Sequence, residues 1–203
     1  DSAGVLGAGR LGKAANICEA MIKDRDCKVF LGLAGPLVPG GMRDIIIDLI
    51  ENKWVDAVVT TGATLTHDLG EALGYRHYQG SADADDAELY KKGLDRIYES
   101  YMPNEIYESM EDFIDKIFLN LKDKKSIKDF LWEIGKHTPK KSILKVAYKN
   151  RIPVFCPAIA DSGIGLMIWG QLCKNKKINI DAFDDLKEII NISWGSKKNG
   201  VVD

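Results

Sequence analysis

The sequence has few of the residues that hold metal ions or form disulfide frameworks. It contains four cysteines and three histidines in 203 residues. No two cysteines stand at CxxC spacing, and His67, His77 and His137 are far apart in the chain. Zinc sites and disulfide scaffolds use such residues at short, regular spacings. We therefore expect Cys18, Cys27, Cys156 and Cys173 to be buried free thiols, and we expect no metal.

Long apolar runs and an excess of basic residues are also absent. No run approaches the roughly 20 apolar residues that span a bilayer, and the first residues lack a signal-peptide pattern. The net charge is −2 and the pI is near 6.0, whereas nucleic acids and anionic membranes attract basic proteins. We expect a cytoplasmic protein with neither partner. With 45% hydrophobic and 29% charged residues, the chain can fold around one sizeable core.

Two consecutive strand, glycine-rich loop and helix units open the chain. Residues 28–33 read as a strand and 34–41 as a loop, and the apolar spacing in 42–51 predicts a helix with one buried face. A second strand at 55–59 is compact and mostly β-branched, as a strand buried on both faces requires. Such units connect by right-handed crossovers, so they predict an α/β fold with a parallel sheet.

The loop at residues 60–64 is the first candidate site. It offers hydroxyls and backbone amides just before a helix that carries Asp68 and Glu71 on its polar side. In open α/β sheets, ligands bind outside the carboxyl ends of the strands, against helix N-termini. The alternative is that any strand-to-helix unit has this pattern.

A third glycine-bearing loop, at residues 156–165, follows a short strand at 152–155. Asp161 in this loop is the most chemically specific residue of the chain. Its carboxylate could accept from ribose hydroxyls or hold an ammonium group, or it could cap the following helix. The sequence leaves both roles open.

The middle of the chain reads as helical. Helices are predicted at 87–101, 105–121, 127–134 and 143–148, with a solvated charge run at 122–125. The acidic residues Asp83, Asp85, Asp86 and Glu88 could hold a cationic substrate, although capping of a helix by Ser81 or Asp83 is the favoured interpretation. We expect one NAD-binding-like domain over residues 1–203, with a helical insertion at about 85–150.

The last part predicts helices at 164–172 and 181–190 and the beginning of a strand at 199–203. A sheet that ends within a strand suggests a fragment. Near the other end, residues 7–12 read GAGRLG and match the GxGxxG dinucleotide motif, but only six residues precede it. The motif needs a complete strand before its first glycine, so we interpret this match as coincidental. An ordinary NAD dehydrogenase is the weak alternative that it would support.

Four segments in this order and spacing resemble deoxyhypusine synthase: FLGLAGPLVPGGMRDII at 30–46, VDAVVTTGATLTHDLGEALG at 55–74, HYQGSADADD at 77–86 and PVFCPAIADSGIG at 153–165. The resemblance covers nearly the whole chain and is closest to the archaeal and bacterial synthase-like branch. It implies a Rossmann-like parallel sheet with helices on both faces, from which a C-terminal part is missing.

The resemblance also implies an activity. Members of this family are NAD-dependent transferases of hypusine biosynthesis and are usually homotetramers. They move an aminobutyl group from the polyamine spermidine to a lysine of the hypusine-bearing translation factor, and a related branch uses another amine as acceptor. The residues that match NAD-binding positions are Gly35, Pro36, Thr60, Thr61, Gly62, Asp161, Ser162 and Gly163. In the first of these loops Gly35 and Pro36 replace polar residues, which leaves mainly backbone groups.

The substrate side departs from the family pattern. Thr66 and His67 stand where a synthase has two glutamates, and Leu166 stands where it has an aspartate for the polyamine. A histidine there could act as a neutral acceptor or proton shuttle and would suit a different amine. The departures favour, as the alternative, a non-catalytic paralogue that assembles with and regulates an active synthase.

The catalytic lysine that the resemblance implies lies in an SWGK motif after a GGG loop, and both are absent from this chain. Residues 193–197 read SWGSK, but their spacing from Asp161 is too short. We therefore interpret Lys197 as a surface lysine. The catalytic residue stays unknown, and we expect this chain by itself to be inactive.

Overall fold

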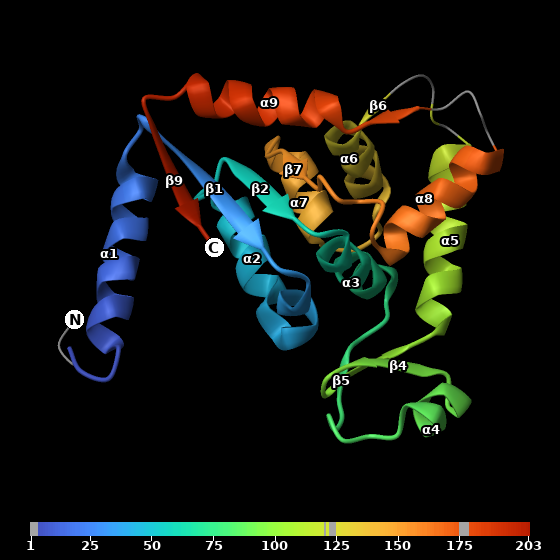
Figure 1. Cartoon of the computed structure of the whole chain (residues 1–203). Coiled ribbons are helices and arrows are strands. Elements are labelled where there is room, and N and C mark those ends of the chain that lie inside the picture. Colours follow the sequence, from blue (N-terminus) through green and yellow to red (C-terminus); the bar gives the residue numbers. More distant parts are fainter. Residues whose placement is uncertain (1–3, 120, 122–124, 175–178) are drawn as a thin grey trace.

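A parallel sheet forms the centre of the computed structural model, which describes residues 4–119, 121, 125–174 and 179–203 (Figure 1). Its strands are β1 (Cys27–Leu33), β2 (Ala57–Thr60), β7 (Val154–Phe155) and β9 (Lys198–Val202), in the order β7-β2-β1-β9. Every neighbouring pair is parallel, with Phe30 opposite Ala57 and Val59 opposite Phe155. The expected α/β fold with a parallel sheet is confirmed.

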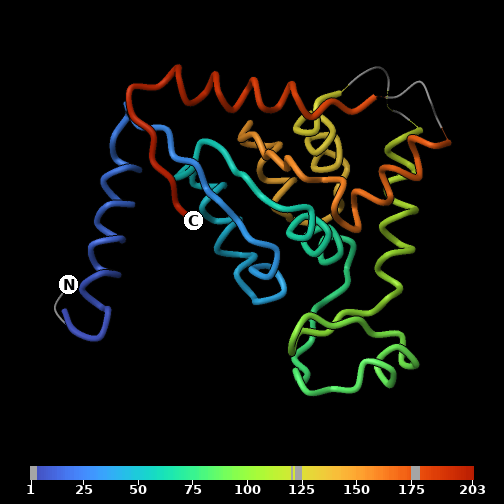
Figure 2. Tube along the Cα trace, in the orientation of Figure 1, coloured from blue at the N-terminus to red at the C-terminus, as the bar shows by residue number. Residues whose placement is uncertain are grey.

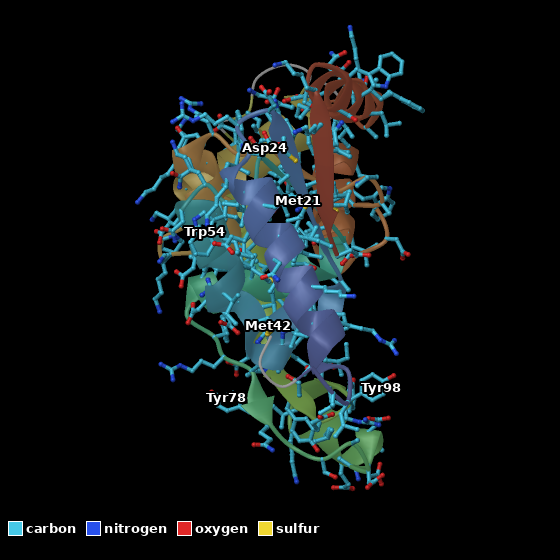
Figure 3. The ribbon with its side chains drawn as sticks, turned by 90° about the vertical axis from the view of Figure 1, so that its left-hand side faces the viewer. Met21, Asp24, Met42, Trp54, Tyr78 and Tyr98 are labelled. Carbon is cyan, nitrogen blue, oxygen red and sulfur yellow. The ribbon has the colours of Figure 1, made fainter. Side chains whose placement is uncertain are left out.

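Helices flank this sheet: α1 (Ala8–Lys23) lies beside the edge strand β9, and α2 (Arg43–Glu51) lies next to β1 and β2 (Figure 1). Seen from the left of that view, α1 stands in front of the strands (Figure 3). The remaining long helices are α3 (Gly62–Leu73), α5 (Glu105–Phe118), α6 (Ile127–His137), α7 (Ile143–Asn150), α8 (Gly163–Lys174) and α9 (Phe183–Trp194). Within the described residues, none of the helices combines the length and apolar character that a membrane crossing needs.

The glycine motif near the N-terminus is not a nucleotide turn. Residues 4–7 form no strand, and α1 begins at Ala8, directly after Gly7 with φ 88°. α1 has no buried residue and meets the sheet where Met21 packs against Gly200 of β9, which leaves no space for a Cβ there. The interpretation of GAGRLG as coincidental is therefore confirmed.

A small antiparallel sheet projects from the main body, at the lower right of Figure 2. It contains β3 (Tyr78–Gln79), β4 (Leu94–Ile97) and β5 (Ser100–Pro103), and the short helix α4 (Asp86–Lys91) precedes β4. The expected helix at 87–101 is wrong. Gly93 and Tyr98 have φ values of 68° and 50°, so the backbone leaves the helix after α4 and then reverses between β4 and β5.

The acidic cluster before α4 caps that helix. Asp85 accepts a hydrogen bond from the backbone N–H of Ala87 at 2.8 Å. The capping interpretation is thus confirmed, but Asp85 performs it, and not Ser81 or Asp83. Of the charge run predicted at 122–125, residues 122–124 lie outside the described part of the chain.

Residues 85–150 contribute both the β4–β5 hairpin and helices α5, α6 and α7. The apolar faces of these helices, including Met110, Phe130 and Leu144, belong to the same core cluster as Val29, Leu31 and Val58 of the sheet. α6 and α7 cross so closely that a Cβ on Gly135 would collide with the backbone of Leu144. α3 packs into the same core, which therefore holds in place both α3 and the ends of β2 and β7, the strands that precede α3 and α8.

Candidate functional site

Three loops meet at the edge where β1, β2 and β7 end. The loop after β1 consists of two short helical turns, η1 (Gly35–Leu37) and η2 (Val38–Met42). A Cβ on Gly35 would lie 2.9 Å from Cβ of Ala63 and 3.4 Å from Oγ1 of Thr61, and a Cβ on Gly62 would collide with Ser162. Glycine at positions 35 and 62 thus lets the three loops approach one another.

The threonines of the second loop have different roles. Thr60 is buried and its hydroxyl donates to the carbonyl oxygen of Leu33 at 3.3 Å, so this side chain ties β2 to β1. Thr61 is exposed and caps α3 by accepting from the N–H of Thr64 at 3.5 Å. Thr61 is therefore the part of this loop that is open to a ligand.

In the third loop, Ser162 and not Asp161 caps α8. The Ser162 hydroxyl accepts from the backbone N–H of Gly165 at 3.0 Å and donates to the carbonyl oxygen of Ile159 at 2.7 Å. Asp161 is exposed, and its carboxylate makes no hydrogen bond or ion pair with the described residues. Of the two roles that the sequence left open for Asp161, the cap is excluded.

The residues expected on the substrate side do not lie together. Thr66 is buried, donates to the carbonyl oxygen of Gly62 at 2.9 Å and accepts from the N–H of Ile164 at 3.2 Å. Its hydroxyl therefore joins α3 to the start of α8. Leu166 is 66% exposed on α8. His67, in contrast, lines a cavity.

His67 belongs to a chain of hydrogen bonds. Its Nδ1 lies 2.9 Å from Nε2 of His77, and Nδ1 of His77 lies 2.8 Å from Oε1 of Glu71. Burial, and then the neighbouring His77, lowers the pKa of His67 to about 4, although Glu71 acts in the opposite direction. His67 is therefore a neutral imidazole near pH 7.

Arg43 connects the His67–His77–Glu71 hydrogen bonds to a buried carboxylate, that of Asp68. Its Nε lies 2.8 Å from Oδ1 of Asp68 and 3.5 Å from Oε2 of Glu71. Asp68 also accepts from the backbone N–H of Ile143 at 3.0 and 3.1 Å. Burial raises the pKa of Asp68 to about 6, in spite of Arg43. The network fixes the polar face of α3 against α2 and α7.

Two cavities lie beside this network, and both are lined by His77, Ile97 and Ser100. The larger, of about 430 Å³, lies between the loop after β1 and the small sheet. Tyr78 and Tyr98 belong to its wall and are labelled at the lower end of Figure 3. The smaller, of about 180 Å³, is also lined by His67, Asp95, Arg96, Met102 and Tyr107.

Several residues that line the cavities could not be predicted from the sequence. His77, Asp95, Ser100 and Tyr107 were not predicted, because the hairpin that presents two of them was expected to be a helix. Burial raises the pKa of Asp95. The guanidinium of Arg96 pairs with Asp86 outside the cavity, so it does not neutralise Asp95.

Lys197 and most of the cysteines lie at or near the surface. Lys197 is exposed and pairs with Asp26 at 3.0 Å, which confirms it as a surface lysine. The four cysteines are free, but only Cys156 is buried, so the expectation that all are buried is wrong. Within the described residues, no group of histidine, cysteine and acidic side chains could hold a metal ion.

The fold and the convergent strand-end loops define a Rossmann-like α/β protein with a site at the carboxyl edge of its sheet. The family model for deoxyhypusine synthase matches residues 2–203. The chain belongs to the deoxyhypusine synthase family.

Relatives with this name occur in archaea and bacteria. The chain is 41% identical over 199 residues to a probable deoxyhypusine synthase 1 of Methanosarcina mazei, covering 97% of this chain and 62% of the relative. It is 36% identical over 203 residues to a deoxyhypusine synthase-like protein of Chlorobaculum parvum, covering 96% of this chain and 58% of the relative. The chain thus spans about three fifths of the length of these relatives.

A solved structure shares the fold. A deoxyhypusine synthase candidate from Entamoeba histolytica matches with a TM-score of 0.71 at 22% identity, covering 97% of this chain and 72% of that chain. At this identity the match supports the fold alone.

Proposed function

We propose that this chain belongs to an NAD-dependent transferase that moves an aminobutyl group from spermidine, or a related polyamine, to another amine. The acceptor is a lysine of the hypusine-bearing translation factor or a second small amine. The observation that carries the proposal is the convergence of the loops at Gly35, Thr61–Gly62 and Ser162, next to the cavity that His67 lines. The proposal includes a homotetramer in the cytoplasm.

The residues at the strand ends fit a dinucleotide. Glycine at positions 35 and 62 lets the three loops pack closely together, and the loops lead into the N-termini of α3 and α8, where the helix dipole favours a phosphate. The unpaired carboxylate of Asp161 can accept from ribose hydroxyls. NAD, when bound, supplies a hydride acceptor for oxidation of the polyamine. Gly35, Pro36, Thr61, Gly62, Asp161, Ser162 and Gly163 would hold it, whereas Thr60 supports the loop from inside.

The amine site would differ from that of a synthase with a full set of carboxylates. Here the neutral His67 and the exposed Leu166 replace two charged partners of the polyamine. Loss of one partner from a desolvated charge pair costs about 2–5 kcal/mol. We therefore propose that spermidine binds weakly in the usual pose, and that a smaller or less charged amine competes well.

The cofactor claim is tested by NAD binding to the chain, measured by calorimetry. We expect Asp161→Asn to weaken NAD about tenfold, because a charged acceptor for the ribose becomes neutral. Asp112→Asn is the matched control, since Asp112 is an exposed carboxylate on α5, away from the loops. Equal effects of the two substitutions, or no NAD binding, would remove the support for the cofactor site.

The transfer claim is tested with the product of the complete reading frame. It is incubated with NAD and spermidine labelled in the aminobutyl group, and label is followed into the translation factor, into putrescine and into other amines. Label in any acceptor supports the proposal. No transfer to any of them, by protein that binds NAD, would contradict it.

A second candidate function is a non-catalytic paralogue that assembles with and regulates an active synthase. The commitment of the Thr66 hydroxyl to Gly62 and Ile164, and the exposed Leu166, favour this alternative because neither offers a charge to a polyamine. Mixing the protein with an active synthase from the same cell would test it. Neither co-elution nor a change in synthase rate would count against it.

A further inference from the structure

Three side chains form a continuous hydrogen-bonded chain beside the smaller cavity. His67 and Glu71 lie on α3, and His77 lies in the segment between α3 and β3. The side chain of His77 is 8% exposed, and both of its ring nitrogens have partners, His67 at 2.9 Å and Glu71 at 2.8 Å. His77 therefore has no nitrogen left for a ligand and acts on the site only through His67.

The order of the partners, from Glu71 through His77 to His67, determines which ring nitrogens carry hydrogens. A carboxylate only accepts, so Nδ1 of His77 carries the hydrogen of that bond. In a neutral imidazole the other nitrogen is then an acceptor, so Nε2 of His77 accepts from Nδ1–H of His67. Nε2 of His67 is consequently left without a hydrogen and with its lone pair available.

The remaining surroundings keep this arrangement in place. Arg43, held by Asp68 at 2.8 Å, lies 3.5 Å from the second oxygen of Glu71. It holds that carboxylate in place. No described residue hydrogen-bonds to Nε2 of His67, while His67 itself lines the cavity together with Asp95 and Tyr107. The residues that line this cavity thus include a carboxylate, a phenol and the imidazole of His67.

We propose that His77 and Glu71 are positioning residues that hold His67 in its Nδ1–H tautomer, so that Nε2 presents a fixed acceptor to an ammonium or amine N–H in the cavity. The use of this acceptor for the polyamine rests on the proposed function, whereas the tautomer itself does not. Because burial lowers the pKa of His67 to about 4, the acceptor stays unprotonated near pH 7.

The tautomer is measured directly by ¹⁵N NMR of the chain labelled in its histidine rings, at pH 8. Only three histidines contribute signals, and single His→Gln variants assign them. We expect His67 to show a pyrrole-like Nδ1 and a pyridine-like Nε2. A hydrogen on Nε2 of His67 in the unaltered chain would overturn the proposal, because it would mean that His77 donates to His67 through a doubly protonated ring.

Two substitutions of His77 distinguish its hydrogen bond to His67 from its contribution to packing. His77→Phe keeps a ring but removes the acceptor, so we expect His67 to shift towards the Nε2–H tautomer that free histidine prefers. His77→Gln retains an amide oxygen that can accept from Nδ1–H, so we expect it to preserve the tautomer. His137→Phe is the matched control, because His137 lies on α6 and bonds to the carbonyl oxygen of Glu133. An unchanged His67 signal in His77→Phe would also overturn the proposal.

Spermidine is the probe for the ligand part. We expect its addition to shift Nε2 of His67, and we expect about tenfold weaker spermidine binding in His77→Phe with recovery in His77→Gln. Spermidine binding without any change at Nε2 overturns the acceptor role and leaves the transferase proposal standing. Failure of both spermidine and putrescine to bind, with the expected tautomer intact, contradicts the proposed function and leaves the positioning of His67 supported.

Discussion

The guanidinium of Arg43 and the carboxylate of Asp68 form a buried ion pair, with Nε and Oδ1 2.8 Å apart and the Asp68 side chain 1% exposed. The same carboxylate receives the backbone N–H of Ile143, the first residue of α7. One side chain of α3 thus fixes both α2 and α7, and it also holds the arginine that fixes Glu71.

Asp68→Ala should lower the free energy of unfolding by about 3–5 kcal/mol, because it leaves Arg43 and the Ile143 N–H without their buried partner. Asp68→Asn should cost less, since its amide oxygen still accepts and a neutral group avoids the desolvation that raises the pKa of Asp68 to about 6. Urea denaturation measures both. Glu88→Gln, which breaks the exposed pair with Lys91, is the control and should change stability by less than about 0.5 kcal/mol.

Acidification should destabilise the chain through His67. Its pKa is about 4 in the folded chain and 6.5 ordinarily, so between these values the unfolded chain binds the extra proton. Stability from this group therefore falls as pH drops from about 6.5 to 4, by up to about 1.4 kcal/mol per pH unit, and is constant above that window. Asp68 acts in the opposite direction below about pH 6, since its folded pKa is raised.

The difference between the unaltered chain and His67→Gln removes the Asp68 contribution. We expect the stability of His67→Gln relative to the unaltered chain to increase progressively as pH falls through that window. His137→Gln is the matched control, because it removes a histidine that is exposed on α6 and not buried at the cavity. A relative stability that does not depend on pH would contradict the lowered pKa of His67.

Gly135→Ala should destabilise the chain by about 1–3 kcal/mol, because the new Cβ would meet the backbone of Leu144 where α6 and α7 cross. Gly170→Ala provides the comparison within α8, since no described residue outside its own stretch of helix backbone comes within 4 Å of its Cβ position. There the substitution should stabilise by about 0.5–1 kcal/mol, through the helix propensity of alanine. If the denaturation midpoints of the two variants shift in the same direction, steric contact between position 135 and the Leu144 backbone does not explain the effect.

The strands, the glycine-rich loops and most helices could be predicted from the sequence because their signals are local. The β-branched run of β2 and the apolar spacing of α2 each describe one element by itself. The hairpin could not be predicted in this way. Residues 87–101 contain good helix formers, and the reversal depends on positive φ values at Gly93 and Tyr98 that the apolar pattern does not report.

Only the loops of the candidate site could be predicted from the sequence, and the contacts among its side chains could not. Loops at the ends of parallel strands must share one edge of the sheet, so the meeting of Gly35, Thr61 and Ser162 follows from topology. The role of His77 depends on side-chain packing after a chain reversal. A single histidine in a polar segment does not indicate which side chains it will contact, so this role could not be predicted. Likewise, the burial of Thr66 could not be read from its position beside His67.

Gly74 makes the reversal that returns His77 to His67, and it provides the last prediction. It ends α3 with φ 116°, in the left-handed region, where its N–H bonds to the carbonyl oxygens of Glu71 and Gly70. Alanine there is strained by about 1–3 kcal/mol, so Gly74→Ala should lower stability by that amount. It should also weaken the Nδ1–H preference of His67 in the ¹⁵N spectrum. Gly40→Ala, at an exposed glycine with open space around its Cβ position and no positive φ, should change neither quantity. An unaltered His67 signal in a destabilised Gly74→Ala protein would show that the His67–His77 bond does not need this turn.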